Sequence, residues 1–391
     1  MHYYTHEELD GATRASLNGF ARSAKIHGRS KMKVNELRDA LRKQLPPREG
    51  TSPGLFVELC AGTAALSLRL HKEGARPPVS RMGSKTGYAL AILHELGLYP
   101  GLKAERYLWC EPDDGCRLLL ETYRDHDLAT AAAEIIRGWK DEDPKSLWTR
   151  LRKEGPAVAP TPREAARWCY VADHSYRRGF PKSGFRDDLA AYQRGTRGKP
   201  RHAATRNAEN IGSLPTIPGE ITDEAVDPRE AARWCVSEAW TNQNQRYMGP
   251  DRPSKCHPPG WVASITLDGL NGRVSTLPAL PGEITDGAVE PPLLPPNTVV
   301  YIDPPYVNTT GYKHNLGRDR VVELALAWHA AGATVCISEQ EAIPELVAAG
   351  WGSVDITGKR QGQKRTFSKQ NSEYLTVSPT PLEHEKVAPN D

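Results

Sequence analysis

Short apolar segments alternate with helix-like amphipathic segments in two stretches of this 391-residue sequence, residues 51–150 and 298–380. LFVEL opens the first stretch, and TVVYI opens the second. Strands that alternate with helices predict a largely parallel sheet that is covered by helices on both faces. We therefore expect one Rossmann-like α/β domain whose two halves lie apart in the sequence.

The stretch between them, residues 151–297, differs in composition and is rich in Pro, Gly, Arg and Asn. It contains two near-repeats. REAARWC occurs twice, and LPTIPGEITDEAVDP at 214–228 returns as LPALPGEITDGAVEP at 277–291. The repeats are too short and too unevenly spaced for a solenoid. We interpret this stretch as a region inserted into the α/β domain.

The two ends of the chain differ from the α/β stretches. Residues 1–50 predict a small helical module, because Val34, Leu37 and Leu41 follow helical spacing among basic residues. The segment SKMKVNELRDALRK resembles the short SAP and Rho-N-type motifs that bind nucleic acid. The alternative is a basic, solvated helix that docks on the main domain. Residues 381–391 predict a loose tail.

Composition narrows the class of protein. The formal net charge of +3 is nearly balanced, so a nucleic-acid partner has to be argued from local clusters. The seven cysteines form no C-x-x-C pair, which indicates neither a metal site nor a disulfide framework. No apolar run approaches the ~20 residues of a membrane span. We expect a cytoplasmic protein without a membrane partner; the oligomeric state is left open.

A small-residue turn follows the first predicted strand. In FVELCAGTAALSLRL, a strand, a tight turn and a helix succeed one another, and small residues let a ligand approach the backbone. Glu58 stands just before the turn, and Glu111 ends the next predicted strand. An acid at that second position suits the two hydroxyls of a ribose. Together these features predict a nucleoside-type ligand, and the absence of G-K-[ST] argues against a phosphate-binding loop.

The segment VVYIDPPYVN, residues 299–308, ends a strand with two prolines, which cannot continue a ladder of hydrogen bonds. An exocyclic amino group of a nucleobase is a poor nucleophile, and two acceptors about 3 Å away activate it by holding its hydrogens. Asp303 offers a carboxylate, and Pro304 offers a rigidly held carbonyl. Tyr306 offers a face on which a flipped-out base stacks.

DPPY after a strand, with VELCAGTAA upstream and SEYLTVS near the end, resembles the amino-directed DNA methyltransferases, most of all the Dam-like adenine-N6 group. The resemblance covers both α/β stretches. It implies S-adenosyl-L-methionine as the cofactor and methyl transfer to N6 of adenine in double-stranded DNA. It also implies a bacterial or phage origin, with restriction-modification as one setting.

The resemblance also implies roles for individual residues. The catalytic residues would be Asp303, Pro304, Pro305 and Tyr306. The cofactor would be bound by Glu58, Cys60, Ala61, Gly62, Thr63, Gly83, Ser84, Lys85 and Glu111. Two features depart from the family pattern: Ala64 stands where the family has a glycine, and the G-S-K segment follows the cofactor turn instead of preceding it.

Basic residues mixed with glycine and aromatic residues predict the contacts with DNA. The candidate residues in these segments are Arg194, Arg197, Lys199, Arg201, Lys364 and Arg365, and the inserted stretch would then be the target-recognition region. The family resemblance implies that Tyr312 helps to hold the target base. Solvated loops are the alternative for the basic segments. Three other functions stay open: methylation of N4 of cytosine, methylation of an RNA base, and nucleic-acid binding by a protein that has lost its activity.

Overall fold

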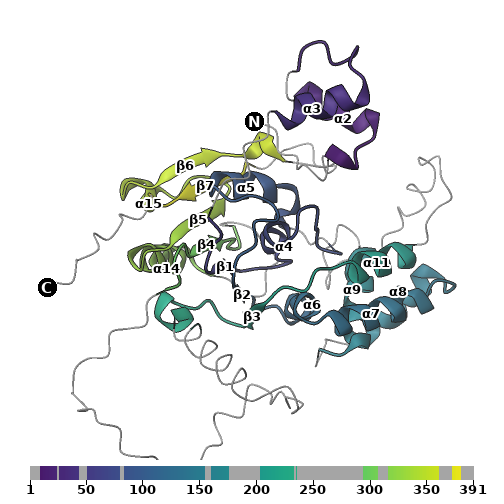
Figure 1. Ribbon diagram of the computed structural model, residues 1–391. Helices are drawn as coiled ribbons and strands as arrows, with labels where there is room; N and C mark the ends of the chain where they lie inside the picture. Colours follow the sequence, from purple (N-terminus) through teal and green to yellow (C-terminus); the bar gives the residue numbers. More distant parts are fainter. Residues whose placement is uncertain are drawn as a thin grey trace, which may run out of the picture. The chain divides into compact units, whose positions relative to one another are not determined.

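The computed structural model (Figure 1) contains a seven-stranded sheet that is flanked by helices. It describes residues 9–23, 26–43, 51–79, 83–154, 160–175, 203–232, 235, 294–306, 316–360 and 372–379. The strands are β1 (Phe56–Leu59), β2 (Tyr107–Cys110), β3 (Gly219–Thr222), β4 (Val299–Ile302), β5 (Thr334–Glu339), β6 (Gly352–Asp355) and β7 (Tyr374–Val377).

The strand order is β3-β2-β1-β4-β5-β7-β6. Strands β1 to β5 are parallel, whereas β7 runs antiparallel to both β5 and β6. The parallel part follows the 3-2-1-4-5 order of doubly wound sheets. The prediction of a Rossmann-like α/β fold is therefore confirmed.

The order in which the strands are added to the sheet reverses at β1. Phe56 pairs with Tyr107 of β2 on one side and with Val299 of β4 on the other. The chain proceeds outward from β1 through β2 and β3, and then returns to add β4 and β5 on the opposite side. In open α/β sheets, ligands bind outside the carboxyl ends of the strands at such a switch point. The fold thus marks the ends of β1 and β4 as the first place to look for a site.

The helices that accompany the sheet in the described residues are α4 to α9, α11, α14 and α15. Asp113, Asp125 and Thr161 cap three of them by accepting hydrogen bonds from backbone N–H groups of the first turn. Their bounds are α4 (Ala65–His71), α5 (Ala89–Glu95), α6 (Asp114–Arg124), α7 (His126–Gly138), α8 (Pro144–Lys153), α9 (Pro162–His174), α11 (Ala203–Gly212), α14 (Arg318–Ala330) and α15 (Pro344–Ala348), with the 3₁₀ turns η1 (Lys85–Gly87) and η4 (Thr357–Lys359).

The four-residue strands β1, β2 and β4 are buried along their whole length, as expected for parallel strands that are covered on both faces. The ring of Trp109 stacks near Tyr107, with an interplanar angle of 28°. A Cβ atom at Gly219 of β3 would lie only 2.8 Å from the Trp109 ring. Glycine at this position therefore lets β3 lie beside the large side chains of β2.

Part of the predicted insertion belongs to the α/β unit. β3 pairs with β2 in parallel, and the backbone N–H of Tyr107 donates to the carbonyl of Pro218 at 3.1 Å. Helices α9 and α11 contribute Trp168, Tyr170 and Ile211 to the same hydrophobic core as Tyr107. The predicted start of the insertion, after residue 150, is therefore too early. The strand β3 was assigned to the insertion because its sequence forms part of a near-repeat.

The chain divides into two compact units. One contains residues 1–231 and 294–391, and the other contains residues 232–293. The second unit lies almost entirely outside the described residues, so the predicted role of this region in recognising a target stays a prediction.

The helices α2 (Arg14–Ser23) and α3 (Val34–Arg42) near the N-terminus share a core of their own. The Arg38 guanidinium donates to the carbonyl oxygens of Leu9, Asp10 and Ala12, so it ties α3 to the segment before α2. The buried residues of this core are Leu9, Leu17, Ala21, Ile26, Leu37 and Leu41. A separate core is what an independent small module requires; its binding of nucleic acid stays a prediction.

Within the described ranges, we find no helix that has both the length and the apolar character needed to cross a bilayer.

Candidate active site

Three backbone hydrogen bonds align the loops that leave the sheet at its carboxyl edge. The N–H of Asp303 donates to the carbonyl of Leu59 at 3.1 Å. The N–H of Ala61 donates to Cys110 at 3.0 Å, and that of Glu111 donates to Thr222 at 2.8 Å. Asp303 and Glu111 directly follow β4 and β2, and Ala61 is the second residue after β1. The pairing of the strands thus continues into the loops and brings Asp303, the small-residue turn and Glu111 together.

The small-residue turn has left-handed φ angles at three positions, and only one of these positions is a glycine. Cys60, Gly62 and Ala64 have φ angles of 61°, 56° and 43°, all in the left-handed region. For a residue with a Cβ atom, this conformation costs about 1–2 kcal/mol. Ala64 therefore departs from the family pattern in residue type while retaining the conformation that glycine favours. Such local strain is typical of ligand-binding turns.

Glu111 is buried and joins the turn to the loop after β2. One carboxylate oxygen accepts from the N–H of Gly62 at 2.6 Å, and the other accepts from the N–H of Asp113 at 2.9 Å. The predicted role of Glu111 toward a ribose agrees with this placement and stays a prediction.

Glu58 contacts the helix that follows the small-residue turn. Its Oε1 accepts from both the N–H and the hydroxyl of Ser67, at 2.8 and 2.5 Å. The indole of Trp109 donates to the same Ser67 hydroxyl at 2.8 Å. Glu58 is buried within β1, and this burial raises its pKa to about 7. In the structure, Glu58 anchors the first turn of α4 to the sheet, and its predicted role in binding the cofactor stays a prediction.

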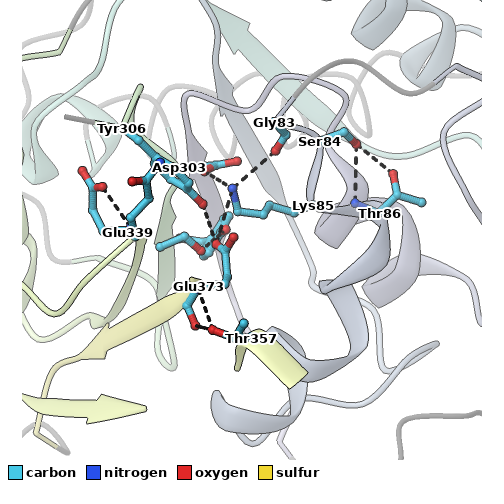
Figure 2. A network of polar contacts seen from close by, with 12 residues as sticks. Gly83, Ser84, Lys85, Thr86, Asp303, Tyr306, Glu339, Thr357 and Glu373 are labelled. Atoms are coloured by element: carbon cyan, nitrogen blue, oxygen red, sulfur yellow. Dashed lines mark hydrogen bonds and ion pairs between the residues drawn. The ribbon is translucent and has the colours of Figure 1, made fainter. Parts of the chain in front are cut away.

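The G-S-K segment lies beside the small-residue turn despite its unexpected place in the sequence. The hydroxyl oxygens of Ser84 and Thr63 are 3.1 Å apart. Lys85 begins η1, and its ammonium donates to Asp303 Oδ1 at 2.6 Å and to the carbonyl of Gly83 at 3.3 Å (Figure 2). Lys85 is thus directed at the DPPY segment, and its predicted role in binding the cofactor stays a prediction.

Tyr306 and Glu373 complete this polar network. The Tyr306 hydroxyl donates to Glu373 Oε1 at 2.5 Å, and the Tyr306 ring centroid lies 4.7 Å from the Lys85 ammonium. Glu373 directly precedes β7, and Glu339 ends the adjacent strand β5. Because β7 is antiparallel to β5, its amino end lies at the carboxyl edge of the parallel strands. The reversed strand therefore supplies an acid to the site.

Burial and charge determine the protonation of the network. Burial raises the pKa of Asp303 to about 6, although the neighbouring Lys85 opposes this rise. Burial disfavours the charged form of Lys85, but Asp303, Tyr306 and Glu373 together raise its pKa well above its ordinary value. Burial likewise raises the pKa of Tyr306, which remains a neutral phenol. Near pH 7, the site contains a carboxylate at Asp303 that is paired with an ammonium.

The DPPY segment has the backbone that its prolines predict. β4 ends at Ile302, and residues 303–306 have no regular secondary structure. Pro304 is buried, while Pro305 is partly exposed. The predicted catalytic residues thus follow the strand directly and face the turn after β1.

The predicted contacts with DNA cannot be placed. Tyr312, Arg194, Arg197, Lys199, Arg201, Lys364 and Arg365 all lie outside the described residues. Their roles stay predictions.

Two features escaped the sequence analysis. Asp223 follows β3 and lines a cavity of about 570 Å³ with residues of α6, including Asp114 and Arg117. The sequence GEITD, in which an acid follows a strand-like segment, could have indicated Asp223. We interpreted it only as part of a near-repeat. The ion pair between Lys85 and Asp303 joins residues 218 positions apart, and no local pattern reports such a pair.

A scan against models of protein families finds no match to this sequence, and a search of curated proteins finds no similar one. The function therefore has to be inferred from the chemistry and geometry of the site.

The buried Glu58 predicts a pH-dependent stability. The folded protein holds the Glu58 proton up to about pH 7, whereas the unfolded chain releases it near the ordinary value of 4.5. The free energy of unfolding therefore falls as the pH rises through this window, by about 3 kcal/mol from this group. Glu58→Gln keeps an acceptor for Ser67 and removes the titration. Urea unfolding at pH 5 and pH 8 should show a smaller loss for the variant; equal losses would contradict the prediction.

The left-handed Ala64 predicts an unusual order of substitutions. Ala64→Gly relieves strain but adds freedom to the unfolded chain and removes a buried methyl group, so stability should stay within about 1 kcal/mol of the parent. Ala64→Val places a branched side chain in the same conformation and in a packed site, which should cost about 3 kcal/mol. Thermal and urea unfolding measure both. A glycine variant that is less stable than the valine variant would show that the turn is not left-handed.

Proposed function

We propose that this protein transfers a methyl group from S-adenosylmethionine to N6 of adenine in DNA. The observation that carries the proposal is the hydrogen bond of 3.1 Å between Asp303 N–H and the Leu59 carbonyl. It sets the first residue of DPPY beside the strained turn after β1, at the switch point of the sheet. An amino-activating group and a turn suited to a nucleoside ligand thereby share one edge.

The residues at this edge fit the chemistry of S-adenosylmethionine. Glu111 offers carboxylate oxygens to the ribose hydroxyls, and the turn from Cys60 to Ala64 offers a closely approachable backbone. Asp223, after β3, offers an acceptor to an amino group such as that of the cofactor adenine, beside the cavity that it lines. When bound, the cofactor would supply an electrophilic methyl group, and its sulfur would keep the electron pair of the broken S–CH3 bond as a neutral thioether.

Asp303 and Pro304 would activate the target. The Asp303 carboxylate and the Pro304 carbonyl accept the two hydrogens of the adenine amino group, which concentrates the lone pair on nitrogen as the new C–N bond forms. The bond between nitrogen and one hydrogen then breaks, and the proton passes to Asp303 or to solvent. Tyr306 provides a ring on which the extruded base stacks, since a base within a duplex cannot reach this edge.

Removal of the Asp303 carboxylate tests the mechanism. Asp303→Ala and the isosteric Asp303→Asn should lower methyl transfer to DNA by at least about 100-fold, because the charged acceptor is lost. The affinity for S-adenosylmethionine should change little, because its proposed contacts lie on β1, β2 and β3. Isothermal titration calorimetry measures binding, and radiolabelled methyl transfer measures turnover. Full activity in either variant would refute the mechanism, and a parent that does not bind S-adenosylmethionine would refute the function.

A further inference from the structure

The ammonium of Lys85 stands where the mechanism requires a substrate amine. It donates to Asp303 Oδ1 at 2.6 Å and lies 4.7 Å from the centroid of the Tyr306 ring. An adenine amino group that is activated by Asp303 and stacked against Tyr306 needs this carboxylate and this face. Lys85 and the target amine therefore compete for one position.

A second acceptor is available to Lys85 nearby. Glu373 Oε1 lies 3.6 Å from the Lys85 ammonium, about 1 Å beyond the distance at which Lys85 now contacts Asp303. The Tyr306 hydroxyl donates to this same oxygen at 2.5 Å, and the backbone N–H of Glu373 donates to the hydroxyl oxygen of Thr357 at 2.8 Å. Glu373 is therefore fixed in place, whereas a lysine side chain has a flexible stem.

The surroundings favour exchange between the two carboxylates over release of the ammonium to solvent. The Lys85 side chain is only 5% exposed, and the Glu373 side chain is 8% exposed. A buried ammonium without a partner is strongly disfavoured, so Lys85 can leave Asp303 only for another acid. Glu373 meets this requirement within the same network (Figure 2).

We propose that Lys85 occupies the amine position of the empty site and moves from Asp303 to Glu373 when the target base enters. This inference rests on the proposed function. Glu373 is then a positioning residue: it receives the ammonium, leaves the Asp303 carboxylate to the substrate, and keeps the Tyr306 ring in place through the shared oxygen.

Glu373→Gln tests the exchange. The amide oxygen still accepts from Tyr306, but the negative charge that receives Lys85 is gone. Lys85 then stays on Asp303, so KM for DNA should rise at least tenfold while kcat and the affinity for S-adenosylmethionine change little. Each variant is assayed over a series of pH values, because removing Lys85 removes the charge that opposes the rise in the pKa of Asp303.

The double variant separates exchange from a structural role. Adding Lys85→Met to Glu373→Gln removes the competitor, so KM for DNA should return to within about threefold of the parent. Lys85→Leu repeats the comparison with different packing, and thermal unfolding identifies any variant that does not fold. The assay uses saturating S-adenosylmethionine, and calorimetry reports its affinity for each variant.

The outcomes are distinct. Rescue of KM in either double variant supports the exchange. If both folded double variants keep a KM as high as that of Glu373→Gln, or higher, the exchange is overturned while the parent still methylates DNA. A parent that methylates no DNA overturns the proposed function, and this inference with it.

Discussion

The ion pair between Lys85 and Asp303 is the interaction on which the site depends. Its atoms are 2.6 Å apart, and it joins the two α/β stretches across 218 positions of sequence. A buried pair of this kind is tolerated only when further hydrogen bonds and charges satisfy both partners. Around Lys85, the Gly83 carbonyl, the Glu373 carboxylate and the Tyr306 ring supply them. Three separate segments thereby have to meet at one edge of the sheet before the Lys85 charge is stable.

The sheet makes this meeting possible. Parallel pairing places the ends of β1, β2, β3 and β4 at one edge, and backbone hydrogen bonds continue between the loops that follow. The antiparallel β7 brings Glu373 to the same edge from the opposite direction. The strain at Cys60 and Ala64 is located in the turn at the centre of this arrangement. Rigid strands thus surround a turn that holds a disfavoured conformation, as is common at binding sites.

Much of this architecture is predictable from local sequence patterns. The alternation of apolar and amphipathic segments predicts the sheet, and the two prolines after Ile302 predict the end of β4, because both effects act over a few residues. Membership of β3 in the sheet was not predicted, since GEIT occurs in both copies of a repeat and its pairing with β2 is a long-range contact that no local pattern reports. The contact of Glu58 with Ser67 was missed for a similar reason: an acid before a turn suits a ligand and a helix terminus equally well. The Lys85–Asp303 pair depends on the tertiary fold alone.

The central claim is that this edge of the sheet methylates the amino group of adenine in DNA. The most direct measurement is expression of the intact chain in a host that lacks DNA methylation, followed by sequencing of the host DNA for modified bases, with Asp303→Ala expressed in parallel. We expect N6-methyladenine at one short, recurring sequence in cells with the parent protein and none in cells with the variant. Unmodified DNA, N4-methylcytosine alone, or a mark that is found only in RNA would contradict the account.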